Sequence, residues 1–132
     1  MAGTVVCNTL NTDTGLFSTN NAYSGIAKAW IQFNGGSSPT INGSFNVSSI
    51  TYVSTGYYTI NFATAMSNAT YSVTGNANIN TSGSTFVCIC PFGNPSSPYY
   101  STPTTSAFNI FCIQSFGGTG GDPRTASVVV FD

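Results

Sequence analysis

The chain has 132 residues and a net charge of −1, and only 4% of its residues are charged, against about 25% in an ordinary soluble domain. Two cations are too few to hold nucleic acid or an anionic membrane surface, and a content of 41% hydrophobic residues excludes a disordered chain. This length suits one domain over residues 1–132 with a hydrophobic core of its own.

The first strand is expected at residues 26–34, which contain the only Lys and the only Trp of the chain. Residues two apart share one face of a strand. One face is therefore apolar and made of Ala27, Ala29, Ile31 and Phe33. Lys28, Trp30 and Gln32 share the opposite face, and the pattern leaves three roles open for it: a core position reached through a bulge, a subunit interface or a ligand platform.

Further strands follow along the chain. Residues 45–53 and 57–62 flank the short loop "STG" and predict a hairpin, in which Gly56 can adopt positive φ. Residues 69–80 alternate without a break between one apolar or small face and one face of Ser, Thr and Asn, which indicates a strand with one solvated side. Residues 63–68 form one helical turn at most.

The last part of the chain is more apolar. Residues 86–90 and 107–116 are apolar on both faces, which favours central strands or strands covered on both sides. Residues 126–131 predict a final buried strand. About seven or eight strands joined by turns indicate an all-β fold, an antiparallel, jelly-roll-like β-sandwich.

Four tyrosines are candidate contacts for a ligand or receptor. Tyr99 and Tyr100 lie in a long loop, residues 91–105, and Tyr57 and Tyr58 lie beside the predicted hairpin. Long loops are often functional, and tyrosines among Ser, Thr and Asn can hold neutral sugars or another protein. The alternative is that these rings only cover the sandwich.

The chain offers little for catalysis or metal binding. It has no His and no Glu, so we predict no catalytic residue, metal or cofactor. Its three carboxylates, Asp13, Asp122 and Asp132, are expected to be solvated in loops or at the terminus. The cysteines are expected to be reduced and buried as small hydrophobic residues; they are Cys7, Cys88, Cys90 and Cys112.

The N-terminus "MAGTVVCNTL" lacks the basic region of a signal peptide, and no apolar run approaches the roughly 18 residues of a membrane span. The chain is therefore expected to be a complete short protein that stays in the cytosol, with no membrane insertion.

Three segments resemble a domain of bacteriophage tail-fibre and virion proteins. They are "GIAKAWIQFNG" (25–35), "INGSFNVSSITYVSTGYYTINFATAMSNATYSVTGN" (41–76) and "SVVVFD" (127–132). The resemblance implies a non-enzymatic virion component that is commonly trimeric. The family usually carries this domain behind a shaft and an anchor, and their absence here favours a small protein that decorates the capsid or a vertex, or forms a fibre tip.

This resemblance implies partners and a location. We expect a homotrimer assembled in the host cytoplasm and displayed on the virion in contact with capsid or fibre subunits. The alternative is a tail-fibre adhesin that binds host surface glycans through Tyr99, Tyr100 and neighbouring loops. Because the predicted strands lack the charges that protect sheet edges, a closed oligomer is favoured, and the face of Lys28, Trp30 and Gln32 is predicted to be its interface.

Overall fold

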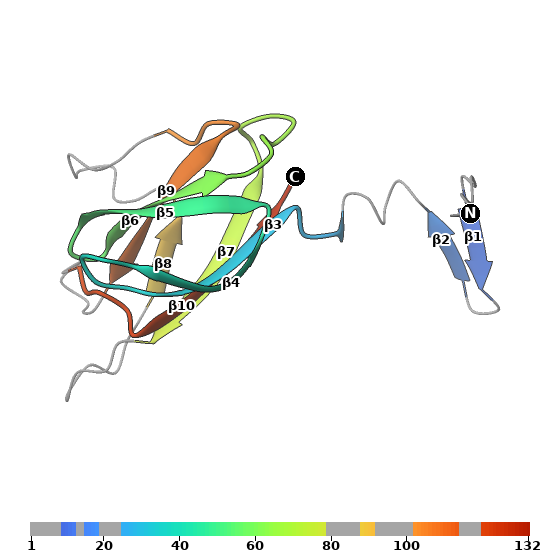
Figure 1. Cartoon of the computed structure of the whole chain (residues 1–132). Coiled ribbons are helices and arrows are strands. Elements are labelled where there is room, and N and C mark those ends of the chain that lie inside the picture. The colour runs from blue at the N-terminus through green and yellow to red at the C-terminus, as the bar shows by residue number, and fades with distance from the viewer. Residues whose placement is uncertain (1–8, 13–14, 19–24, 79–87, 92–101, 114–119) are drawn as a thin grey trace, which may run out of the picture.

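The described elements of the chain are all strands (Figure 1). The structure is a computed structural model that describes residues 9–12, 15–18, 25–78, 88–91, 102–113 and 120–132. The strands are β1 (Thr9–Thr12), β2 (Gly15–Ser18), β3 (Ala29–Asn34), β4 (Thr40–Phe45), β5 (Val47–Ser54), β6 (Tyr57–Phe62), β7 (Ser72–Asn78), β8 (Cys88–Pro91), β9 (Ala107–Ile113) and β10 (Thr125–Phe131).

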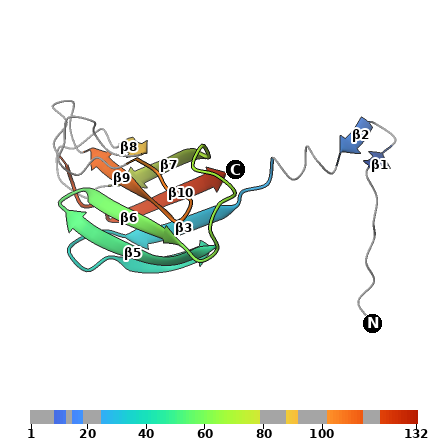
Figure 2. The same ribbon diagram turned by 90° about the horizontal axis from the view of Figure 1, so that it is seen from above.

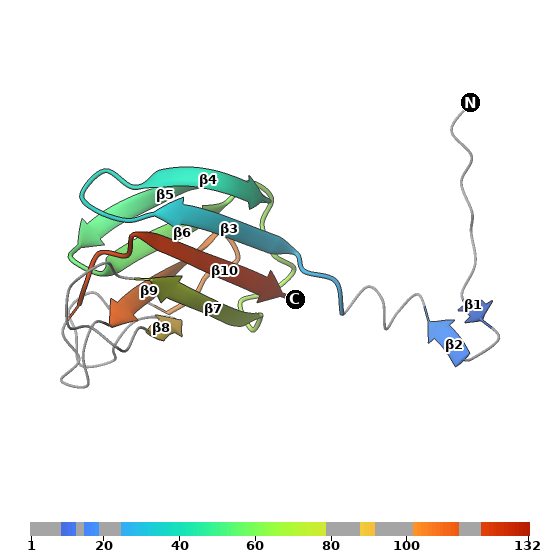
Figure 3. The same cartoon turned by 90° about the horizontal axis from the view of Figure 1, so that it is seen from below.

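Eight of these strands form two four-stranded sheets that pack face to face. One sheet has the order β4-β3-β10-β7 and lies in front in Figure 3. The other has the order β5-β6-β9-β8 and lies in front in Figure 2. Every pairing is antiparallel. The expected antiparallel β-sandwich is therefore confirmed.

The core lies between the two sheets, because four strands present alternate apolar residues to one another. Strands β3, β6 and β10 alternate in burial along their length, as period-two side-chain geometry requires. The central strands β3, β6, β9 and β10 contribute to this core Ala29, Ile31, Phe33, Tyr58, Ile60, Phe62, Phe108, Ile110, Cys112, Ala126, Val128 and Val130, with Met66 and Tyr71 added from the segment between β6 and β7.

The chain crosses from one sheet to the other at Asn46, between β4 and β5. Asn46 has φ 54°, a left-handed conformation that Asn adopts more readily than most residues. Its amide nitrogen donates to the carbonyls of Lys28 and Thr64, both at 3.1 Å, and its side-chain oxygen accepts from the Thr64 backbone N–H at 2.7 Å. The Asn of "SFNV" thus fixes the corner where the chain changes sheets.

The expected strands agree with the structure in most places. Residues 57–62 form β6 as predicted, with Gly56 at φ 78° in the preceding turn, and residues 63–68 contain no helix. Strand β7 has the predicted solvated face. Strand β9 lies centrally between β6 and β8.

Other expectations need correction. Strand β8 is an edge strand, so a central place for residues 86–90 is wrong. Residues 40–45 form β4, a strand that the sequence did not predict, and the predicted strand 45–53 in fact begins after the corner at Asn46. The β1–β2 hairpin was also not predicted, and its strands pair with neither four-stranded sheet.

Candidate functional site

The side chains of strand β3 point alternately into the core and to the outer face, as the sequence alternation predicts. Ala29, Ile31 and Phe33 are at most 2% exposed, whereas Trp30 keeps 41% of its surface exposed. The β3–β4 pair has a bulge, but it falls between Gln32 and Phe33 and leaves Trp30 on the outer face. A core position for Trp30 is therefore excluded, and the outer face of the β4-β3-β10-β7 sheet is a candidate site.

The indole of Trp30 lies against the neighbouring strand at Gly43. A Cβ added at Gly43 would lie 3.4 Å from both Cη2 and Cζ3 of the ring, so the missing side chain provides the place where the ring rests. Beside the ring is an open hollow of about 410 Å³. Its polar lining comes from Gln32 and Asn42 on one side and Ser127 on the other.

A second hollow continues this surface toward β7. It has a volume of about 270 Å³, is lined by Thr74, Gly75 and Asn76, and shares Ser127 and Val129 with the first hollow. The strand register places Gln32 opposite Ser127 and Ser127 opposite Asn76. A polar row thus crosses β3, β10 and β7 next to Trp30.

The polar groups in this row are open to an added partner. Within the described residues, the side chains of Gln32, Thr74, Asn76 and Ser127 make no hydrogen bond. The four strands of this sheet contain no charged residue. The surface therefore combines one exposed ring with neutral donors and acceptors.

The outer face of the other sheet is different, because its polar side chains bind one another. The Thr59 hydroxyl donates to Asn109 Oδ1 at 2.7 Å, and Asn61 Nδ2 donates to Ser49 Oγ at 3.0 Å. The ring of Tyr57 stacks on Phe111 with the centroids 4.1 Å apart. These polar side chains and rings therefore already contact one another.

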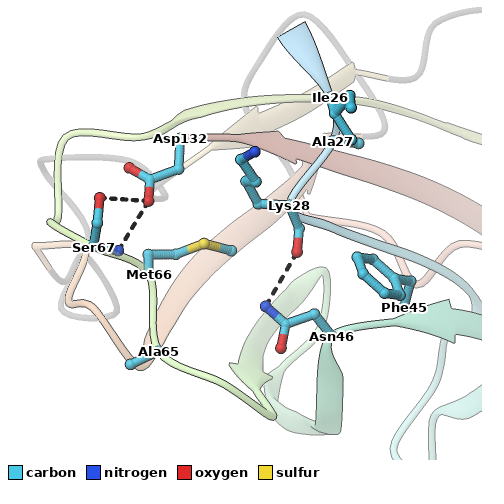
Figure 4. A pocket seen from close by; sticks show the side chains of 9 residues that line it. All are labelled: Ile26, Ala27, Lys28, Phe45, Asn46, Ala65, Met66, Ser67 and Asp132. Atoms are coloured by element: carbon cyan, nitrogen blue, oxygen red, sulfur yellow. Dashed lines mark hydrogen bonds between the residues drawn. The ribbon is translucent and has the colours of Figure 1, made fainter. Parts of the chain in front are cut away.

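A third hollow lies at the end of the sandwich where β3 begins (Figure 4). It has a volume of about 530 Å³ and is mostly apolar, with Ile26 59% exposed and Phe45 55% exposed at its rim. Lys28 and Asp132 also line it. The predicted interface residues are therefore divided: Lys28 belongs to this apolar end, and Trp30 and Gln32 belong to the neutral face.

The carboxylate of Asp132 is held by the loop between β6 and β7. It accepts from the Ser67 hydroxyl at 2.7 Å, from the Ser67 backbone N–H at 2.9 Å and from Asn68 Nδ2 at 3.1 Å. The hydrogen bonds from Ser67, with a smaller contribution from Lys28, lower the pKa of Asp132 below its usual value.

Asp122 joins three loops at the opposite end of the sandwich. Its Oδ1 accepts from the Tyr58 hydroxyl at 2.7 Å and from the Gly56 backbone N–H at 2.9 Å, and the Tyr58 oxygen accepts from the Gly36 N–H at 2.8 Å. Asp122 and Asp132 are thus hydrogen-bonded structural groups, which corrects the expectation of merely solvated carboxylates. Asp13 lies outside the described residues.

The predicted tyrosine contacts are not brought together. Tyr58 is 0% exposed and belongs to the core, so its prediction as a contact for a ligand or receptor is wrong. Tyr57 is half-buried against Phe111. Tyr99 and Tyr100 lie outside the described residues.

Cys112 is buried, as expected for a small hydrophobic residue. The side chains of Cys88 and Cys90, and the whole of Cys7, lie outside what the structure describes. The described residues contain no cluster of metal-ligating side chains and no helix long and apolar enough to cross a membrane.

Comparison with known proteins gives no relative: no family model, no curated protein and no solved structure matches this chain. The resemblance to phage virion proteins therefore stays a prediction.

Proposed function

We propose that this chain is a non-enzymatic structural protein of a bacteriophage virion, displayed on the particle surface and assembled as a homotrimer. It would sit on the capsid, at a vertex or at a fibre tip, in contact with other virion subunits. The resemblance supports this role, and its motifs contain residues that shape the sandwich, including Ala29, Phe33, Asn46 and Phe62.

The observation that carries the assembly proposal is the apolar end of the sandwich. Ile26 and Phe45 each expose more than half of their surfaces and line the same hollow, which is also lined by the cation Lys28 and the anion Asp132. Contiguous exposed apolar surface rimmed by polar groups is typical of a contact with another protein. A second copy can cover it, since Lys28 of one copy and Asp132 of another offer complementary charges.

Copy number on the particle tests the virion role. Quantitative mass spectrometry of purified phage should detect this protein in a fixed ratio to the major capsid protein. Hundreds of copies would indicate a capsid decoration, and a few tens or fewer would indicate a vertex or tail position. Absence from purified particles would refute the virion role.

Light scattering after size exclusion tests assembly. The wild-type chain should have the mass of a trimer, and Phe45→Ser should shift it toward monomer because a polar side chain replaces the largest apolar group of the contact. Val53→Ser is the matched control, since Val53 is 38% exposed but lies on β5 outside the apolar end. A monomeric wild type, or equal effects of both variants, would contradict the proposed contact.

A further inference from the structure

We propose that the outer face of the β4-β3-β10-β7 sheet binds a neutral oligosaccharide, with Trp30 as the stacking platform and the row of Gln32, Ser127 and Asn76 as its hydrogen-bonding partners. Trp30 adjoins the apolar end, because it lies opposite Phe45 in the β3–β4 register, but the polar row extends away from that end across β10 and β7. Ligand binding here does not depend on where the protein sits on a particle.

Trp30 is held in place and yet remains accessible. Its ring rests against Gly43, and the residue keeps 41% of its surface exposed. An aromatic ring held in this way is a rigid apolar surface that loses little conformational freedom on binding. The C–H face of a pyranose ring is an apolar surface of comparable size.

The neighbouring polar groups differ between the two sheets. On the β5-β6-β9-β8 sheet, outward amides and hydroxyls pair with one another, as Thr59 does with Asn109. On the Trp30 face, the side chains of Gln32, Asn76 and Ser127 make no hydrogen bond within the described residues. Side chains of the same types therefore hydrogen-bond to one another on one sheet and are available to a ligand on the other.

The surface complements a neutral sugar. The sheet contains no charged residue, so it offers nothing to neutralise a phosphate, sulfate or carboxylate. A neutral sugar carries hydroxyls that both donate and accept around its ring. These match amide and hydroxyl side chains, which need partners when they leave water.

A protein partner suits this face less well. Burying the polar row against another subunit would remove several unpaired amides and hydroxyls from water, and each one left without a partner costs about 1–3 kcal/mol. The more apolar end around Ile26 and Phe45 suits a protein contact better. Trp30 and Gln32 are thus assigned to ligand binding instead of the subunit interface.

The shape of the surface indicates a chain of sugars. The two hollows share Ser127 and Val129 and together extend from Asn42 on β4 to Asn76 on β7. Three inter-strand spacings give a length of about 14 Å. The oligosaccharide would cross the strands, with one ring on Trp30 and the next above Ser127.

The single Trp of the chain makes the experiment specific, because its fluorescence reports only on this face. The full chain is titrated with neutral oligosaccharides of glucose, galactose, mannose and N-acetylglucosamine, and with an oligogalacturonate as the acidic comparison. At least one neutral oligosaccharide should change the Trp30 emission saturably and give the same dissociation constant by calorimetry. The oligogalacturonate should bind no more tightly.

Variants then locate the site. Trp30→Ala should weaken binding, measured by calorimetry, about tenfold or more, and Trp30→Phe should weaken it less because a smaller ring remains. Asn76→Ala, at the far end of the hollows, should weaken binding about threefold to tenfold. Thr59→Ala on the opposite sheet is the control and should leave the dissociation constant unchanged.

Three results would overturn the inference. The first is that no neutral oligosaccharide binds at millimolar concentration. The second is that binding persists unchanged in a folded Trp30→Ala variant. The third is that Trp30→Ala dissociates an oligomer while no sugar alters the wild-type emission, which would make the face a subunit interface.

Discussion

Tyr58 shows how one hydroxyl can join separate parts of this fold. Its ring is fully buried and packs edge-on against Phe33, with the centroids 5.2 Å apart. Its hydroxyl donates to Asp122 and accepts from the Gly36 N–H, so it links two loops directly, and the Gly56 turn joins them through Asp122 Oδ1. Burial of the polar tip is therefore compensated by two hydrogen bonds.

Tyr58→Phe should lower the free energy of unfolding by about 2 kcal/mol, because the Gly36 N–H loses its acceptor and Asp122 loses a donor. Urea unfolding at neutral pH measures this change. Tyr52→Phe is the matched control in the adjacent strand: its hydroxyl has one exposed contact, 3.4 Å from Thr55, and its loss should cost less than about 0.5 kcal/mol. Equal losses in the two variants would show that the three-loop junction contributes nothing.

At the scale of elements, the β5–β6 turn packs against Cys112 near the end of β9 and against residues 120–122. The Gly56 N–H donates to Asp122, and the Cys112 N–H donates to the Gly56 carbonyl at 2.8 Å. A Cβ at Gly56 would lie 2.7 Å from the Cys112 carbonyl oxygen and 2.8 Å from the Gly121 nitrogen. The turn thus needs glycine for space as well as for its positive φ.

Two glycine variants separate these requirements. Gly56→Ala should destabilise the fold by about 3 kcal/mol. The new Cβ would force backbone atoms to move, and alanine at this positive φ would add backbone strain. Gly36→Ala also has positive φ, at 108°, but nothing lies within 4 Å of its Cβ, so it should cost only about 1 kcal/mol. Thermal unfolding of both variants measures the difference. Similar losses of stability in the two variants would mean that strain in φ alone accounts for the cost of Gly56→Ala.

The sequence predicts a strand well where the segment itself contains both a clear alternation and a turn at its boundary. Residues 57–62 alternate cleanly and follow a glycine turn, and β6 has these bounds. Strand β4 was missed because "TINGSF" contains Asn and Gly in its middle, which disfavour a strand in isolation. Its pairing with β3 supplies the stability, and this contact is not encoded within the segment itself.

At the scale of the molecule, the candidate site was only partly predictable. The outward direction of Trp30 follows from alternation within β3 alone. The row of Gln32, Ser127 and Asn76 requires that β10 pairs with both β3 and β7, although these strands are far apart in sequence. Composition also does not reveal which polar side chains hydrogen-bond to one another, so it cannot show that the side chains of this row lack such partners.

Alkaline pH should destabilise the whole sandwich through its buried phenols. Burial raises the pKa of Tyr71 to about 12, and burial also places the pKa of Tyr58 well above its usual range. Below about pH 10 both phenols are neutral whether the chain is folded or unfolded, so stability is fully retained. Above it the unfolded chain releases protons that the folded chain keeps, and unfolding becomes progressively more favourable.

For Tyr71 this loss should extend from about pH 10 to about pH 12, and for Tyr58 it should continue beyond. Urea midpoints measured across this range should fall with rising pH, and the part of the tyrosinate absorbance that comes from the two buried phenols should appear together with unfolding. Tyr71→Phe should be less stable at neutral pH, since the hydroxyl donates to the Thr104 carbonyl at 2.9 Å, yet its stability should fall less steeply above pH 10. If the variant and the wild type lost stability with the same slope, the buried Tyr71 phenol would not be a source of the alkaline sensitivity.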